Sequence, residues 1–259
     1  MALITLTTDF GLQDFYAAAV VGELKSRIPE AEMITVSHQV QKFDVATGAL
    51  LLRNCWRNFP VGTIHLVSIF TNNTSFYIAL EKDGHFFLGA DNGFFNLMLG
   101  DESPDQIYTI DLKNNSDVDT FPTKDIFVPA VTHLAKGGSM AMLGRKLNAL
   151  SPSSSFEPII NPNSIRGSVL YVDSYFNSIT NIKKDTFISL CRNRTFEIMF
   201  RDPSITVNKI SNSYYDVEEG DIVAIFGSTG LLEIAINQGK AAQLLRLTRA
   251  EIVMIEFYD

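Results

Sequence analysis

The first part of the chain alternates between the hydrophobic period of a strand and that of a helix. Residues 3–7 are apolar and β-branched, which predicts a strand, and residues 15–28 carry apolar side chains at helical spacing. The same order recurs as a predicted strand at 33–36, a helix at 45–56 and a strand at 63–69. Because strands and helices alternate, the pattern predicts a layered α/β domain with a largely parallel sheet.

The pattern changes in the second part of the chain. Short apolar runs alternate there with turns, and no amphipathic helix exceeds about three turns. The runs span 168–172, 196–200, 222–226, 232–236 and 252–257. This spacing favours a small antiparallel β domain, either barrel-like or a sandwich.

A polar stretch separates the two patterns. Pro152 and Pro162 interrupt it, with serines and asparagines on either side, which is typical of a connecting segment. We therefore expect an N-terminal α/β domain at 1–155, a linker at 156–165 and a C-terminal β domain at 166–259.

Composition and charge narrow the class of protein. The 259 residues include 21 Lys and Arg against 29 Asp and Glu, a formal net charge of −8, and 46% are hydrophobic. This is globular composition, and its acidic balance argues against nucleic acid as a partner. No apolar run reaches the ~18 residues of a membrane span, and the first residues lack the basic segment of a signal peptide. We expect a cytoplasmic protein with no membrane partner.

The metal-ligating residue types are sparse. Cys55 and Cys191 form no C-x-x-C pair, and the four histidines show no metal-ligand spacing. We therefore expect no metal site.

Polar residues follow the predicted strands of the first domain. Asp9 follows the first strand, His38 the second and Phe70-Thr71 the third. Ligands of α/β sheets bind outside the carboxyl ends of the strands. Two interpretations of Asp9 stay open at this point, a turn-forming residue or an acceptor-only carboxylate that binds a ribose diol.

Seven short segments then follow one another in a characteristic order. They are ITLTTDFGLQD (4–14), SH (37–38) with FDV (43–45), FPVGTIH (59–65), ADNG (90–93), TF (120–121) with KDIF (124–127), Asp173 and Asn177 before ITNI (179–182), and GSTGLLEIAIN (227–237). Together they resemble the S-adenosyl-L-methionine (SAM) hydroxide adenosyltransferases, the group that includes the fluorinases and chlorinases. The segments cover almost the whole chain.

This resemblance implies a fold, an assembly and a ligand set. The fold is a Rossmann-like first domain joined to a small β domain, and the assembly is a homotrimer that binds SAM between neighbouring subunits. SAM is implied as substrate or ligand, with no further cofactor. The implied ligand-binding residues are Asp9 on the ribose hydroxyls, Phe43 against the ribose, Asp173 and Asn177 on polar groups of the methionine or adenosine part, Tyr214 stacked on adenine, Ser228 on the methionine carboxylate, and Asn237 at the end of the last segment.

The resemblance also implies displacement at the ribose C5′, with methionine as leaving group. Water-using members activate the nucleophile with an Asp, an Arg and a His. Here Phe70 stands in the Asp position and Pro122 in the His position, and no Arg occurs between Arg57 and Arg145.

Phe70 and Thr123 are therefore the expected lining of a small nucleophile pocket. Three alternatives follow from the missing activating set. The chain is a SAM-cleaving enzyme that gives adenosine and L-methionine, a halide-using adenosyltransferase, or a non-catalytic SAM- or nucleoside-binding sensor or interaction module.

Overall fold

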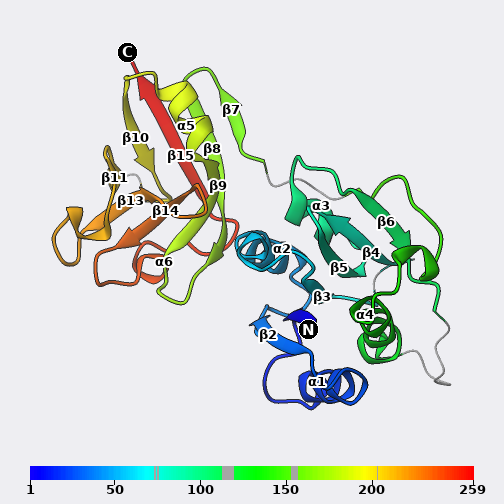
Figure 1. The fold of residues 1–259 in the computed structure, drawn as a ribbon. Coiled ribbons are helices and arrows are strands. Elements are labelled where there is room, and N and C mark those ends of the chain that lie inside the picture. The colour runs from blue at the N-terminus through cyan, green and yellow to red at the C-terminus, as the bar shows by residue number, and fades with distance from the viewer. Residues whose placement is uncertain (73, 75, 113–119, 153–156, 203) are drawn as a thin grey trace. The chain divides into compact units, whose positions relative to one another are not determined.

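The computed structural model describes residues 1–72, 74, 76–112, 120–152, 157–202 and 204–259. It divides into two compact units, Met1–Ser154 and Ser155–Asp259, each with its own hydrophobic core (Figure 1). Among the described residues, no helix has the length and apolar character needed to cross a membrane.

Unit 1 is built on a mixed sheet with the strand order β2-β1-β3-β5-β4-β6. The strands are β1 (Leu3–Thr8), β2 (Glu32–Ser37), β3 (Ile64–Ser68), β4 (Tyr77–Lys82), β5 (His85–Ala90) and β6 (Gln106–Thr109). β1 pairs in parallel with β2 and β3, and β3 pairs in parallel with β5, whereas β4 is antiparallel to both of its neighbours. The expected α/β class with a largely parallel core is confirmed.

Helices cover both faces of this sheet. They are α1 (Tyr16–Arg27), α2 (Val45–Arg53), α3 (Phe94–Leu99) and α4 (Val128–Ala135), with the short helical turns η1 (Trp56–Asn58), η2 (Thr123–Phe127) and η3 (Met140–Met142). Leu66 of β3 packs with α1 and α4, whereas its neighbour Val67 packs with α2 and α3. Because both faces are covered, β3 is buried along its whole length.

Unit 2 is a curled, mainly antiparallel sheet with the strand order β11-β10-β15-β8-β9-β14-β13-β12 (Figure 1). Its elements are β7 (Ile159–Asn161), β8 (Ser164–Val172), β9 (Ser178–Lys183), α5 (Lys184–Cys191), β10 (Thr195–Met199), β11 (Thr206–Val207), β12 (Ile210–Ser211), η4 (Tyr214–Asp216), β13 (Ile222–Phe226), β14 (Leu231–Ile236), α6 (Ala241–Leu244) and β15 (Ile252–Tyr258). The first part of β8 pairs with β15 and the last part with β9, with a register shift between Val169 and Tyr171. This change of partner lets the sheet curl into a half-barrel.

The structure differs from the sequence expectation in two places. Residues 159–161 and the start of β8 form a hairpin inside the segment expected as a linker, because Ile159 pairs with Arg166 and Ile160 with Ile165. The expected helix at 45–56 ends at Arg53 and gives way to η1.

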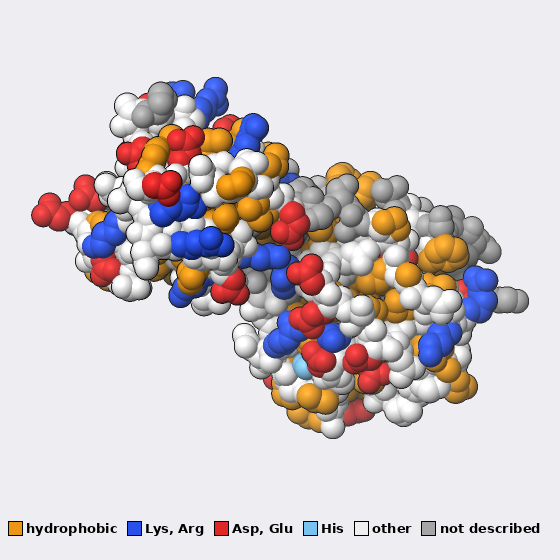
Figure 2. Space-filling model, turned by 90° about the horizontal axis from the view of Figure 1, so that it is seen from above, with side chains coloured by type: hydrophobic (Ala, Val, Ile, Leu, Met, Phe, Trp, Pro, Cys, Tyr) orange, Lys and Arg blue, Asp and Glu red, His pale blue; other side chains and the backbone are white. Residues whose placement is uncertain are grey.

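On the face drawn in Figure 2, acidic and basic side chains are interspersed, so neither sign of charge dominates that face.

Candidate functional site

The carboxylate of Asp9 ties together three loops at the carboxyl end of the unit 1 sheet. Asp9 follows β1 directly and is 8% exposed. Its Oδ2 accepts hydrogen bonds from the backbone N–H of Phe43 (3.0 Å) and of Phe70 (3.3 Å), which follow β2 and β3. Its own N–H donates to the carbonyl of Ser68 at 3.2 Å. Oδ1 receives no hydrogen bond from the residues that the structure describes, so it is available to a ligand donor.

Two aromatic residues flank this carboxylate in strained backbone conformations. Phe43 and Phe70 have φ values of 66° and 48°, a region that non-glycine residues rarely adopt. Their rings meet edge to face with centroids 5.1 Å apart, and Phe43 is 65% exposed. The hydrogen bonds to Asp9 hold both residues in place, which presents an aromatic face beside a carboxylate. The structure thus brings together three of the sequence-predicted site residues.

Thr123 lies against a partner that sequence reasoning missed. The hydroxyls of Thr123, the first residue of η2, and Ser68, the last residue of β3, are 2.6 Å apart and almost fully buried. Two hydroxyls carry two protons, and this hydrogen bond uses one of them. No acceptor for the second proton is found among the described residues, so one O–H of the pair has no acceptor there.

The histidines of unit 1 serve its framework. The two ring nitrogens of His38 form hydrogen bonds with the hydroxyls of Thr8 (2.8 Å) and Thr35 (3.2 Å). Burial lowers the pKa of His38. His65 lies near the amino end of β3 and contacts Thr5 at 2.7 Å and His85 at 3.2 Å. Burial, and then the proximity of His85, lowers the pKa of His65 to about 3, so it is neutral at physiological pH.

In unit 2, Asp173 and Asn177 close a single turn after β8. Asp173 Oδ1 accepts from the backbone N–H of Tyr175 (2.9 Å) and Asn177 (2.8 Å), and its Oδ2 accepts from the Asn177 amide at 3.1 Å. Ser228 is exposed in the turn between β13 and β14. Asn237 is buried, and its amide donates to the carbonyl of Val217 at 2.9 Å, so this amide braces a loop.

Tyr214 is bound to a carboxylate that the sequence analysis did not single out. Its hydroxyl donates to Glu233 Oε1 at 2.6 Å, and Glu233 is 7% exposed in the middle of β14. Desolvation raises the pKa of Glu233; the Tyr214 hydrogen bond opposes this shift and the charge of Asp173 adds to it. Desolvation and the hydrogen bond to Glu233 also raise the pKa of Tyr214. The sequence signal that could have pointed to Glu233 is a glutamate inside the apolar run LLEIAI (231–236).

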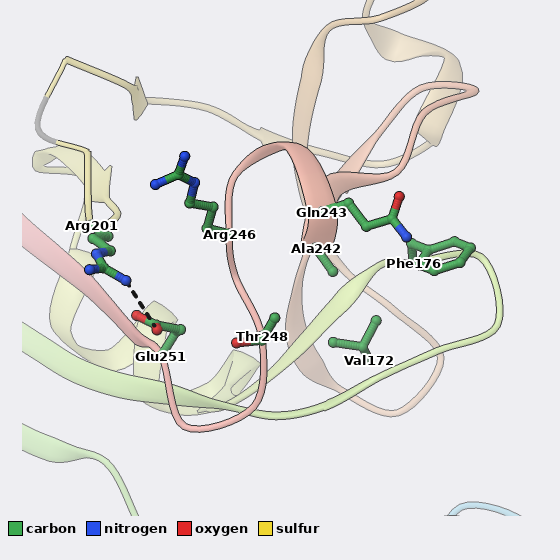
Figure 3. Close-up of a pocket in the computed structure, with 8 residues that line it drawn as sticks. All are labelled: Val172, Phe176, Arg201, Ala242, Gln243, Arg246, Thr248 and Glu251. Atoms are coloured by element: carbon green, nitrogen blue, oxygen red, sulfur yellow. Dashed lines mark ion pairs between the residues drawn. The ribbon is translucent and has the colours of Figure 1, made fainter.

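A cavity of about 540 Å³ lies elsewhere in unit 2 (Figure 3). Phe176 and Ala242 form part of its wall, and Arg201 pairs with Glu251 at 3.7 Å on one side. None of the sequence-predicted ligand residues lines it. Among the described residues there is also no group of three or more His, Cys, Asp or Glu side chains arranged to hold a metal ion.

Comparison with known families identifies the chain. The SAM hydroxide adenosyltransferase N-terminal domain matches residues 4–144, and the C-terminal domain of the same family matches residues 167–254. The chain belongs to the SAM hydroxide adenosyltransferase family. Both matched segments fall within the two units of the structure, one in each.

Relatives of this SAM hydroxide adenosyltransferase family member cover nearly its full length. It is 27% identical to the (R)-S-adenosyl-L-methionine hydrolase of Methanocaldococcus jannaschii over 258 residues, covering 95% of this chain and 92% of the relative. It is 23% identical to the fluorinase of Actinopolyspora mzabensis over 279 residues, covering 93% and 92%. A crystal structure of an uncharacterized conserved protein from Thermotoga maritima superposes with a TM-score of 0.87 at 25% identity, covering 98% of this chain and 99% of that one.

Proposed function

We propose that this protein binds SAM and cleaves it at the ribose C5′, giving adenosine and L-methionine. The observation that carries the proposal is the environment of Asp9. One oxygen of this carboxylate is fixed by two backbone N–H groups, one of them from the exposed residue Phe43, and the other receives no hydrogen bond from the described residues. A fixed carboxylate accepts hydrogen bonds from a ribose diol, and an aromatic face suits the carbons beside a sulfonium.

This reaction requires the protein mainly to position SAM and the nucleophile. The oxygen of a water molecule forms a bond to C5′ while the C5′–S bond breaks. The bonding pair returns to sulfur as neutral methionine, and the water proton passes to solvent. Because the leaving group is already cationic, no general acid is needed, and orientation and desolvation of the nucleophile supply the rate enhancement.

The same reasoning assigns Phe70 and Thr123 to the nucleophile side of the site. Phe70 is held by its backbone to Asp9, and Thr123 shares a buried hydroxyl pair with Ser68. We propose that the apolar ring of Phe70 and the remaining O–H of the Ser68–Thr123 pair line the position of a small nucleophile, in place of a charged activating set. We further propose a homotrimer, in which Asp173, Asn177, Tyr214, Ser228 and Asn237 of one subunit's unit 2 complete the site of its neighbour.

The hydroxyl donor also favours a second candidate function, transfer of the adenosyl group to a halide, because an anion accepts from that O–H. A non-catalytic nucleoside sensor is the third alternative. One experiment separates all three. Purified protein is incubated with SAM in buffers containing nitrate, chloride or fluoride, and the products are resolved by chromatography.

We expect release of adenosine and methionine in every buffer, lost in Asp9→Asn and retained in Glu30→Gln, which removes a charge from an exposed position of the same unit. A halogenated nucleoside in the chloride or fluoride arm would establish the halide alternative. Methionine release no faster than in the protein-free control would establish the binding module and overturn the hydrolase.

A further inference from the structure

The proposed reaction makes no use of the cavity in unit 2 that Figure 3 shows. Its volume of about 540 Å³ lies within the range of ~300–1,000 Å³ that small-molecule sites occupy. Segments far apart in the sequence form its walls, from the end of β8 through the residue after β10 to the loop between α6 and β15. The cavity is therefore a product of the folded unit.

The two ends of this cavity differ in chemistry. In Figure 3 the apolar side chains lie at one end and the charged ones at the other. The apolar end has Val172, Phe176 and Ala242, and the charged end has Arg201, Arg246 and Glu251. A ligand with an apolar body and a charged group at one end matches this division.

The charged end carries a net positive charge. Arg201 and Glu251 pair with each other, Nη1 to Oε1 at 3.7 Å. Arg246 forms neither an ion pair nor a side-chain hydrogen bond with any residue that the structure describes, so its guanidinium is available to a ligand. Guanidinium groups bind carboxylates, sulfonates and phosphates through paired N–H donors. The complementary ligand group is thus an anion.

The apolar end is fixed by contacts around Phe176. The Phe176 carbonyl accepts a hydrogen bond from the Ala242 N–H at 2.9 Å, which ties the turn after β8 to α6. Lys240 Nζ lies 4.6 Å from the centroid of the Phe176 ring. This ammonium is attracted to the ring face and helps to hold the ring in position. It also places a third cation close to the cavity, which favours an anionic ligand over a cationic one.

We propose that this cavity is a second ligand site, for a small organic anion with an aromatic or aliphatic body. Arg246 binds the anionic group, and Phe176 and Val172 contact the body. The site is separate from the one proposed for SAM, because none of the residues expected to bind SAM lines it. Asp173 and Asn177, on either side of Phe176 in the sequence, hydrogen-bond to each other instead.

Two fluorescent probes that differ in one anionic group test this proposal. 1-Anilinonaphthalene-8-sulfonate carries a sulfonate, and N-phenyl-1-naphthylamine has the same rings without it. We expect Arg246→Gln to weaken binding of the sulfonate probe about tenfold, the loss typical of a charged hydrogen bond, and to leave the neutral probe within about twofold. The matched control Arg166→Gln, at an exposed position of β8 outside the cavity, should change neither affinity.

A second variant keeps the charge and fills the space. Thr248 is exposed at the cavity wall, so Thr248→Phe should weaken binding of both probes, and it decides the matter if Arg246→Gln fails to fold. Equal losses of the sulfonate probe in Arg246→Gln and Arg166→Gln, or unchanged binding in Thr248→Phe, would overturn the proposal.

Competition separates the cavity from the SAM site. An excess of S-adenosyl-L-homocysteine should leave the sulfonate probe bound in the cavity. Its complete displacement would overturn the proposal, because the cavity would then belong to the site for SAM. The probe titrations need no SAM cleavage, so failure of the proposed function would leave this inference standing.

Discussion

Asp9 and Glu233 are two carboxylates of nearly equal burial, 8% and 7% exposed, in very different surroundings. Asp9 accepts from two backbone N–H groups of neighbouring loops, whereas Glu233 accepts from a single phenol and lies near a second carboxylate. Burial alone therefore does not decide how stable an ionised carboxylate is in the folded protein. The number and kind of its hydrogen-bond donors also decide it.

The difference follows from where each residue lies on its strand. Asp9 comes just after β1, where the backbone N–H groups of the loops after β2 and β3 are free of the sheet and converge on one point. Glu233 lies within β14, where both neighbouring strands use their backbone groups in the ladder. Only side chains or a ligand can satisfy a carboxylate in that position. The carboxylate of unit 1 thus has two backbone donors in the structure, and that of unit 2 has one phenol donor.

The largest expected effect concerns the open oxygen of Asp9. Asp9→Asn should weaken adenosine binding by ~1.5–3 kcal/mol, because the charge-assisted hydrogen bonds to the ribose are lost. Titration calorimetry with adenosine measures this, and Glu30→Gln serves as the control. Unchanged affinity would remove Asp9 from the binding site and leave it a loop-bracing residue.

The framework role of Asp9 predicts a separate loss of stability. Asp9→Ala leaves the N–H groups of Phe43 and Phe70 without their acceptor, and both residues are in left-handed conformations. The free energy of unfolding should fall by ~1–3 kcal/mol in urea titrations. Asp9→Asn should lose less, because the amide oxygen still accepts. An alanine variant as stable as wild type would show that the loops hold their shape without Asp9.

The hydroxyl pair of Ser68 and Thr123 is an uncharged counterpart to the hydrogen bonds of the Asp9 carboxylate. Ser68→Ala leaves the Thr123 hydroxyl buried without its partner and should cost about 1 kcal/mol of stability. A double-mutant cycle with Thr123→Val measures the coupling, and the double variant should recover part of the loss. Additive losses in the cycle would mean that the two hydroxyls do not depend on each other.

The sequence predicted the elements better than the contacts between them. β13 occupies 222–226 as expected, and Asp9 was found because a carboxylate after an apolar strand is a local signal. The hairpin of β4 and β5 was not predicted, although Asp83 and Gly84 at its turn form the Asp-Gly pair that such turns favour, with positive φ at both. Ser68 and Glu233 escaped notice because their partners lie 55 and 19 residues away. Which polar residue meets which depends on sheet register and chain crossing, neither of which is a local pattern.

The smallest expected effect is a gain in stability on replacing Glu233 by Gln. Because the pKa of Glu233 is raised above its ordinary value of 4.5, the folded state binds a proton more readily than the unfolded state does. The stability of unit 2 without ligand should therefore fall as the pH rises from 4.5 through the raised pKa. Glu233→Gln removes this dependence while its amide oxygen still accepts from Tyr214, so at neutral pH the variant should melt at a slightly higher temperature than wild type.

Thermal unfolding followed by circular dichroism from pH 4 to 8 tests this sign, with Glu219→Gln as the exposed control. A higher melting temperature of Glu233→Gln at neutral pH would mean that unit 2 gives up stability to keep this carboxylate buried. A lower melting temperature at neutral pH would show instead that Glu233 is already stabilised within the unit. The contrast with Asp9 would then be one of position on the strand and no longer one of function.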